Sequence, residues 1–185
     1  MNFAGRFHVR RFLCLLVRQN FTSECEAVIN KQINLELKSS HDYLAMAYHF
    51  DSSDVALPGV YGFFKNASDE ERKHAELLMK YMNKRGGKII LESVPEPKYS
   101  FESTLEAMMQ ALEMEKTINE SLLAAHAVAA QNKDPNLCDF IETNFLQEQV
   151  DALKQLSDYI RQIERCDKEL GSFIFDINLD KDKHH

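Results

Sequence analysis

The chain contains four long segments in which apolar side chains recur every three or four residues. They cover residues 23–50, 58–85, 103–131 and 134–166. That spacing places the apolar side chains on one face of an α-helix. No stretch between them alternates apolar and polar residues in the manner of a β-strand. The sequence therefore predicts an all-α fold in which each helix buries one stripe against the others.

Local signals mark where these helices begin and end. Pro58 is a favoured first-turn residue, and residues 103–106 have the sequence of a capping box. Gly86 supplies a stop signal after the second segment. Gly171 then separates the apolar residues 172–179, which predict a short fifth helix.

The connections between the predicted helices fix their order in space. Residues 51–57 and 132–133 are short links, which join antiparallel neighbours. Residues 86–102 are longer and extended in character. A helix of about 28 residues is roughly 40 Å long, and about seventeen extended residues can cross that distance. We therefore expect a four-helix bundle with one long crossover between its second and third helices.

Charge and hydropathy exclude several classes of function. The net charge is −7, which gives no support for nucleic-acid binding and favours the attraction of cations. The longest apolar runs are much shorter than the ~20 residues that a membrane-spanning helix needs. We therefore expect no nucleic-acid partner and no membrane partner.

The middle of each predicted inward stripe carries polar side chains of the kind that bind metals. The first three stripes contain Glu36, then Glu71 with His74, and then Glu115. Burying a carboxylate costs several kcal/mol unless it is paired or bound to a metal. Glu71 and His74 form a Glu-x-x-His element, which carboxylate-bridged di-iron bundles use. A shared metal site explains these residues together, and a buried polar network without metal is the alternative.

The fourth stripe offers weaker ligands. A stable di-iron cofactor would want a second Glu-x-x-His there, but the stripe has Gln149 and Ala152. A neutral amide oxygen is a poor iron ligand, and alanine is none. The first metal position would have three ligands, and the second little beyond a shared Glu71 and Glu115. Because such a site should release its metal, we expect iron to be a substrate and not a fixed cofactor.

Four stretches carry a resemblance to a known family. They are Asn-Leu-Glu-Leu at 34–37, Asp-Glu-Glu-Arg-Lys-His-Ala-Glu at 69–76, Asn-Lys-Arg-Gly-Gly at 83–87, and Asp-Pro-Asn-Leu-Cys-Asp-Phe-Ile-Glu-Thr at 134–143. With their neighbours they closely resemble the animal ferritins of the heavy, ferroxidase-bearing type, over about residues 17–175. The resemblance implies iron storage and detoxification. A hollow shell of 24 subunits would oxidise Fe(II) with dioxygen and store Fe(III) as an oxide mineral.

The resemblance also implies a role for each residue of a di-iron ferroxidase centre. The residues concerned are Glu36, Tyr43, Glu71, His74, Glu115 and Gln149. Glu36, Glu71 and His74 would hold the first iron. Glu71 and Glu115 would hold the second, beside which Gln149 orders water or dioxygen. Tyr43 matches the nearby hydrogen-bonding or redox tyrosine. A light-chain subunit would lack several of these ligands.

Two further groups of acids follow from the same resemblance. Asp139 and Glu142 match the carboxylates of three-fold channels, where three copies would give six carboxylates around one pore. Glu70 and Glu76 match inner-surface acids associated with mineral nucleation. Lys73 stands where heavy chains usually carry a third glutamate, so we expect nucleation to be weaker or shared with other acids.

The first twenty residues differ from the rest of the chain. They contain four arginines and no acid, which fits a mitochondrial presequence and equally an uncleaved basic arm. Their apolar residues 12–17 are short for a secretory signal, so secretion is the less expected outcome. We therefore divide the chain into an arm or targeting segment, residues 1–20, and a ferritin-like di-iron four-helix-bundle domain, residues 21–185. The expected compartment is the cytosol, with the mitochondrion as the alternative.

Two other functions are open to such a chain. A mineral-holding subunit without oxidase activity would oxidise Fe(II) no faster than buffer does. A di-iron oxygenase acting on an organic substrate would keep its metal pair during dialysis. The sequence also leaves open whether the shell is a homo-oligomer or is mixed with other ferritin subunits.

Overall fold

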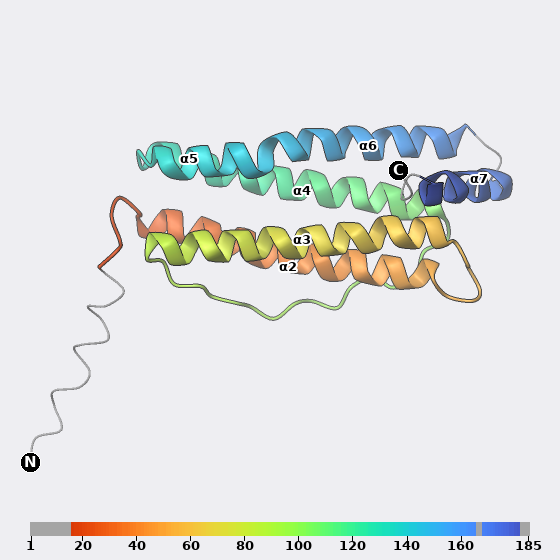
Figure 1. The fold of residues 1–185 in the computed structure, drawn as a ribbon, viewed down its shortest axis with the longest axis horizontal. Coiled ribbons are helices and arrows are strands. Elements are labelled where there is room, and N and C mark those ends of the chain that lie inside the picture. The colour runs from red at the N-terminus through yellow and green to blue at the C-terminus, as the bar shows by residue number, and fades with distance from the viewer. Residues whose placement is uncertain (1–15, 166–167, 182–185) are drawn as a thin grey trace, which may run out of the picture.

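The computed structural model describes residues 16–165 and 168–181, and every regular element within these ranges is helical. The elements are α2 (Ser23–Phe50), α3 (Pro58–Arg85), α4 (Thr104–Gln131), α5 (Pro135–Ile141), the π-helical turn η1 (Glu142–Leu146), α6 (Gln147–Glu164) and α7 (Lys168–Lys181). α2 and α3 form one antiparallel pair, and α4 pairs with the fourth helix, α5 to α6 (Figure 1). The predicted four-helix bundle with one long crossover and a fifth helix is confirmed.

Side chains at the helix ends account for these boundaries. At the start of α2, Thr22 Oγ1 accepts a hydrogen bond from Cys25 N–H at 3.2 Å. At the start of α4, Ser103 Oγ accepts from Glu106 N–H at 3.1 Å, as the capping-box sequence predicts. α3 ends at Arg85 and is capped by Gly86, whose φ of 73° is left-handed and is adopted readily by glycine.

Two asparagines of α2 hold the crossover against the bundle. Asn30 Nδ2 donates to Lys88 O at 2.9 Å, and Asn30 Oδ1 accepts from Ile90 N–H at 2.8 Å. Asn34 does the same one turn later, with Ile90 O and Glu92 N–H, both at 2.8 Å. Each amide therefore satisfies one donor and one acceptor of extended backbone that has no strand beside it. The crossover runs along the outside of the α2–α3 pair from one end to the other (Figure 1).

The fourth helix is interrupted, although the sequence predicted it to be continuous over 134–166. The turn η1 separates α5 from α6, and α6 ends at Glu164. A π turn takes one more residue than an α turn, so it rotates the residues that follow it about the helix axis. Ile141 before this turn and Gln149 after it are both buried. Apolar spacing did not reveal the turn because Phe145, within it, is also buried and keeps the stripe continuous.

The fifth helix is longer than predicted, and Gly171 does not interrupt it. α7 begins at Lys168, and Gly171 is buried within it. A glycine inside a helix costs about 1 kcal/mol relative to alanine, and the packing of α7 on the start of α3 offsets that cost. Asp176 Oδ1 accepts from Val60 N–H at 2.9 Å. A Cβ at Gly59 would lie 2.0 Å from Asp176 O, so this close approach requires a glycine.

Two apolar clusters fill the bundle, one on each side of its middle. One contains Phe50, Phe64 and Met108, and the other contains Ile33, Leu78 and Leu122. The middle of each long helix, between these clusters, carries the buried polar residues that the inward stripes predicted. The fold therefore surrounds one polar layer with apolar packing on both sides.

The predicted arm falls mostly outside the described residues, since residues 1–15 are not among them. Its division from the domain at residue 20 therefore stays a prediction. Within residues 16–165 and 168–181, no helical stretch combines the length and the hydropathy that a membrane span requires.

Candidate metal centre

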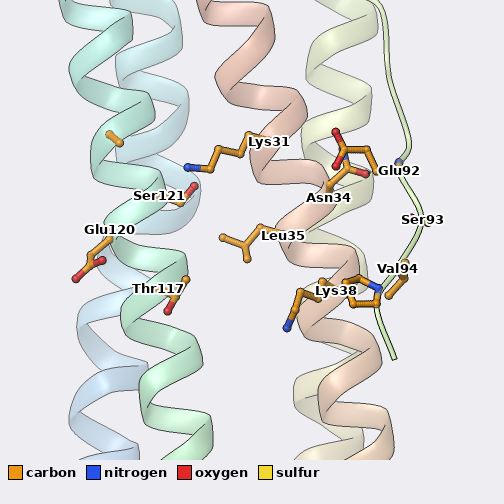
Figure 2. Close-up of a pocket in the computed structure, with 12 residues that line it drawn as sticks. Lys31, Asn34, Leu35, Lys38, Glu92, Ser93, Val94, Thr117, Glu120 and Ser121 are labelled. Atoms are coloured by element: carbon orange, nitrogen blue, oxygen red, sulfur yellow. Dashed lines mark hydrogen bonds between the residues drawn. The ribbon is translucent and has the colours of Figure 1, made fainter. Parts of the chain in front are cut away.

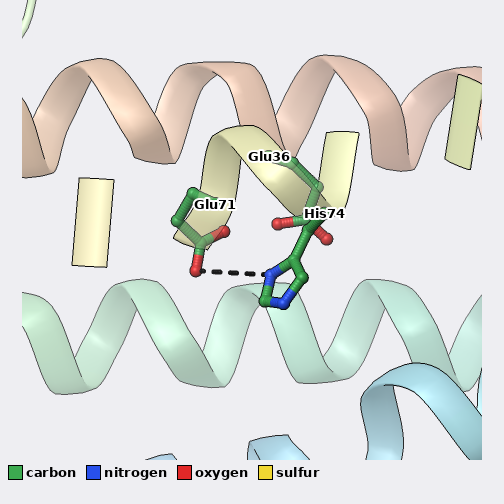
Figure 3. Close-up of side chains that lie close together, drawn as sticks. All are labelled: Glu36, Glu71 and His74. Atoms are coloured by element: carbon green, nitrogen blue, oxygen red, sulfur yellow. Dashed lines mark ion pairs between the residues drawn. The ribbon is translucent and has the colours of Figure 1, made fainter. Parts of the chain in front are cut away.

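Two helices bring three ligand-type side chains together in the polar layer. Glu36 comes from α2, and Glu71 and His74 come from α3, one turn apart. One carboxylate oxygen of each glutamate and one ring nitrogen of His74 lie within 4.8 Å of one another. Figure 3 shows the two carboxylates and the imidazole gathered in one place. Imidazole nitrogen with carboxylate oxygen is a ligand set that suits iron.

The two carboxylates of this cluster are buried without full hydrogen bonding. Glu36 is 0% exposed and Glu71 is 4% exposed. The Oε2 atom of each has no hydrogen-bond partner among the described residues. Burial raises the pKa of Glu71 well above its usual range, and the neighbouring Glu36 raises this pKa further. A divalent cation between the two carboxylates would remove their repulsion and give both free oxygens a partner.

Glu115 on α4 is also buried, but its oxygens are already hydrogen-bonded. The Tyr43 hydroxyl donates to Oε1, and Gln149 Nε2 donates to Oε2 at 3.0 Å. Burial raises the pKa of Glu115, and these two hydrogen bonds oppose the rise. Glu115 does not belong to the close group of Glu36, Glu71 and His74. Of the residues predicted around the second metal position, Glu115 and Gln149 thus form a hydrogen-bonded network with Tyr43.

A cavity of about 240 Å³ is lined both by Glu71 and His74 and by the hydrogen-bonded network of Glu115. Five of the six residues predicted for the ferroxidase centre line it, namely Tyr43, Glu71, His74, Glu115 and Gln149. The sixth, Glu36, lies against Glu71 and His74. The structure therefore brings all six predicted residues to one region of the bundle.

A larger hollow lies elsewhere and has different chemistry. This groove of about 530 Å³ lies between α2, α4 and the crossover, with Lys31 and Lys38 on one wall and Glu120 on another (Figure 2). Its charged side chains do not form a metal-ligand group, since the three-residue cluster above is the one such group within the described ranges. Ligand type and burial, and not size, therefore identify the candidate site.

The two predicted channel acids lie together on the surface near the start of the fourth helix. Asp139 and Glu142 are exposed and line one hollow of about 540 Å³ with Cys138. His126 Nε2 lies 2.5 Å from Glu142 Oε1. The two carboxylates therefore share a face, as their spacing predicts.

The two predicted nucleation acids lie in different surroundings. Glu70 and Glu76 are both exposed on α3. Glu70 lines the cavity of the metal centre, whereas Glu76 lies 3.5 Å from Arg72 in an exposed ion pair. Lys73 is exposed between them. The structure therefore associates Glu70 with the entrance to the centre and leaves Glu76 on the surface.

The sequence interpretation missed two residues beside the cluster. Glu148 Oε2 lies 3.3 Å from His74 Nε2, and the Glu148 side chain is half exposed in the cavity wall. Gln32 is fully buried and donates from Nε2 to Glu36 Oε1 at 2.7 Å. Gln32 stands four residues before Glu36, so helical spacing places both on one face. For Glu148, adjacent to Gln149, the sequence carried no signal separating it from an ordinary surface acid.

Comparisons with known proteins agree with this geometry. The family model for ferritin, described as a ferritin-like domain, matches residues 26–166. The chain is 51% identical over 160 residues to the soma ferritin of Lymnaea stagnalis, covering 86% of this chain and 92% of that protein. It is 51% identical over 162 residues to the ferritin heavy chain of Echinococcus granulosus, covering 87% and 94%. It is 49% identical over 162 residues to the ferritin-1 heavy chain of Schistosoma mansoni, again covering 87% and 94%.

Proposed function

The chain belongs to the ferritin family, and on that premise we propose that it stores and detoxifies iron as a ferroxidase. It oxidises Fe(II) with dioxygen and deposits the product as a ferric oxide mineral inside a shell of 24 subunits. The relatives that are named heavy chains support the ferroxidase activity. Iron is the substrate of this reaction as well as the stored product.

One observation carries the proposal, namely the buried group of Glu36, Glu71 and His74 with two unpartnered carboxylate oxygens. This group is the first iron position. The charge of Fe(II) offsets the repulsion between the two buried carboxylates. Carboxylate oxygens favour the harder ferric ion, and the imidazole of His74 helps to retain the ferrous one.

The second iron position lies between Glu71 and Glu115. To bind there, Fe(II) must compete with the hydrogen bonds from Tyr43 and Gln149 to Glu115. Burial raises the pKa of the Tyr43 hydroxyl well above its usual range, so this hydroxyl stays a donor at neutral pH. The second ion is therefore held weakly, which suits a product that must leave. Each Fe(II) gives up one electron, and dioxygen accepts both together with two protons and leaves as hydrogen peroxide. Water hydrolyses the Fe(III) to the oxide and releases protons.

Acidic side chains supply a route for Fe(II) from the surface to the centre. Asp139 and Glu142 attract the hydrated cation at three-fold channels, once symmetry brings three copies together. Glu70 and Glu148 then line the cavity that leads to His74. Glu70 and Glu76 also offer oxygens for mineral nucleation, with Lys73 lowering the local negative charge. The shell is either homomeric or mixed with other ferritin subunits.

A double variant of the first iron position tests this function. Glu71→Ala combined with His74→Ala removes two ligands, so we expect Fe(II) oxidation to fall to the rate in buffer while the shell still assembles. The matched control, Lys65→Ala with Asp69→Ala, removes an exposed ion pair of the same helix and should oxidise iron at the parent rate. Oxidation is followed by absorbance, and assembly by size-exclusion chromatography. Parent-rate oxidation by the ligand variant would refute the site.

Two measurements on the parent protein separate the alternatives. A mineral-holding subunit without a ferroxidase centre would oxidise Fe(II) no faster than buffer. An oxygenase would retain its metal pair after dialysis against chelator, whereas a centre with one weak position should lose its iron. We expect fast oxidation by the parent and little iron after dialysis.

The domain division and the compartment belong to the same proposal. Residues 21–185 form the ferritin domain, and residues 1–20 are a basic arm of a cytosolic protein. The alternative is a mitochondrial presequence, which would be absent from the mature protein. N-terminal sequencing of protein from its own cells separates the two, since a start after about residue 20 would indicate cleavage.

A further inference from the structure

Gln32 is a buried polar residue that the reaction described above does not use. It is 0% exposed and lies on α2, one helical turn before Glu36. Its Nε2 donates to Glu36 Oε1 at 2.7 Å, and its own Oε1 has no hydrogen-bond partner among the described residues. A glutamine placed only for stability would satisfy both ends, because an unpaired buried polar atom costs free energy. Gln32 instead directs its one hydrogen bond at a proposed iron ligand.

The orientation of the Gln32 amide follows from the chemistry of its partner. A carboxylate can only accept hydrogen bonds, so the amide must present its N–H to Glu36. The reverse orientation would place two oxygens in contact. The hydrogen bond therefore holds Oε1 of Glu36 towards Gln32 and leaves Oε2 without a partner. Oε2 is the atom of Glu36 that has no partner.

We propose that Gln32 is a positioning residue that makes Glu36 bind the first metal ion through Oε2 alone. The inference rests on the proposed function, because it takes Glu36 as an iron ligand. The donor and the ligand lie on the same helix, so the hold on Glu36 exists before any ion arrives. Partners of this kind fix the orientation of metal ligands, and their loss lowers metal affinity by about 10- to 100-fold.

The three carboxylates of the centre show why this role is specific to Glu36. Glu115 accepts one hydrogen bond on each oxygen, so neither oxygen lacks a partner. Glu71 has an unpartnered Oε2 and lies near both Glu36 and Glu115. That location suits a ligand shared by two ions. Glu36 alone combines one oxygen held by an amide with one free oxygen.

Cobalt(II) binding to the iron-free shell tests the proposal without relying on oxidation. Gln32→Met replaces the amide by an apolar side chain of similar size and so removes the hydrogen-bond donor. We expect the tighter Co(II) site to weaken about 10-fold. We also expect its visible absorption band to change, because Glu36 gains freedom to bind through both oxygens. A band change reports coordination, which a loss of stability alone would not alter.

A matched control separates positioning from stability. Asn30 is also buried on α2, and it binds the crossover and not the metal centre. Asn30→Ala should lower the thermal unfolding midpoint while leaving the Co(II) affinity and band unchanged. Should Gln32→Met fail to assemble, Gln32→Glu provides the second test, since it removes the donor and faces Glu36 with a like charge. We expect it to weaken the tight site at least as much.

The outcomes distinguish this inference from the proposed function. If Glu36→Ala abolishes the tight Co(II) site while the Gln32 variants keep the parent affinity and band, Gln32 is not a positioning residue. If Co(II) binds the parent with no dependence on Glu36 or His74, the metal centre itself is wrong and this inference fails with it. A weakened site and an altered band in the Gln32 variants, with an unchanged Asn30→Ala protein, would support it.

Discussion

The metal centre has two halves, and the buried carboxylates of the two halves differ in their hydrogen bonding. In the half formed by α2 and α3, the carboxylates of Glu36 and Glu71 each keep one buried oxygen without a partner. In the other half, Glu115 of α4 accepts from Tyr43 of α2 and from Gln149 of α6. Both halves are buried, so burial alone does not mark a binding site. Buried carboxylate oxygens without a hydrogen-bond partner distinguish the half that is ready for a cation from the half that must rearrange.

The largest expected difference between the halves is in ion binding. Glu36→Ala removes a ligand from the ready half, so we expect the tighter of two Co(II) sites per subunit to be lost, a larger effect than the roughly 10- to 100-fold loss that removing an outer partner causes. Glu115→Ala should leave that site in place and remove the weaker one. Both variants should lose fast Fe(II) oxidation, because the reaction needs two ions. Titration of the iron-free shell with Co(II) measures the two affinities. Equal loss of both ions in both variants would break the distinction between the halves.

Tyr43→Phe tests the hydrogen-bonded half by a smaller change. The variant removes the hydroxyl that donates to Glu115, without changing the volume of the core greatly. We expect Glu115 to accept the second ion more readily but in a less defined position, so that Fe(II) oxidation slows by roughly 2- to 10-fold. Stopped-flow absorbance measures the rate. Oxidation as slow as in the Glu36→Ala variant would mean that Tyr43 does more than hold Glu115.

The smallest expected effect is on stability, and it should differ in size between the two halves. The pKa of Glu71 is raised in the folded protein, above the ordinary 4.5, so the metal-free folded state binds a proton more tightly than the unfolded state does. The free energy of unfolding therefore falls as pH rises through the raised pKa. Glu71→Gln removes this loss of stability and should raise the unfolding midpoint by about 2–4 °C at pH values above the raised pKa.

Glu115→Gln is the matched comparison for that stability effect. Burial raises the pKa of Glu115 too, but the hydrogen bonds from Tyr43 and Gln149 oppose that rise, so the midpoint should rise less than in Glu71→Gln. Calorimetry of both variants in chelator, from about pH 4.5 upward, measures the difference. The difference in unfolding midpoint between Glu71→Gln and the parent should shrink as the pH is lowered towards about 4.5. An equal or larger gain in Glu115→Gln would contradict the contrast between the halves.

Much of the fold followed from the sequence because its signals are local. Helical spacing and caps placed α2 and α3 at their observed bounds, and the length of residues 86–102 predicted the crossover. Gly171 misled because a glycine inside a helix is tolerated where packing compensates for it. The π turn η1 was missed because the buried positions on either side of it keep a helical rhythm. Neither feature can be predicted without knowing which neighbours surround it.

The metal centre was partly predictable for a similar reason. The inward stripes are otherwise apolar, so polar ligand-type residues within them were a signal in the sequence. These residues are Glu36, Glu71, His74 and Glu115. Helical spacing places Gln32 on the same face as Glu36 but does not show which amide atom meets the carboxylate. Glu148 depends on a contact across space with His74, which the sequence does not carry. The partnered state of Glu115 against the unpartnered state of Glu36 likewise required the hydrogen bonds themselves.

The most direct test is a crystal of the iron-free shell soaked in Zn(II), with anomalous difference maps recorded at the zinc edge. Zinc is redox-inert and takes the same imidazole and carboxylate ligands. We expect one strong peak in every subunit, bound by Glu36, Glu71 and His74, and a weaker peak beside Glu115. Peaks confined to surface carboxylates, with those three side chains turned away from one another, would contradict the proposed centre.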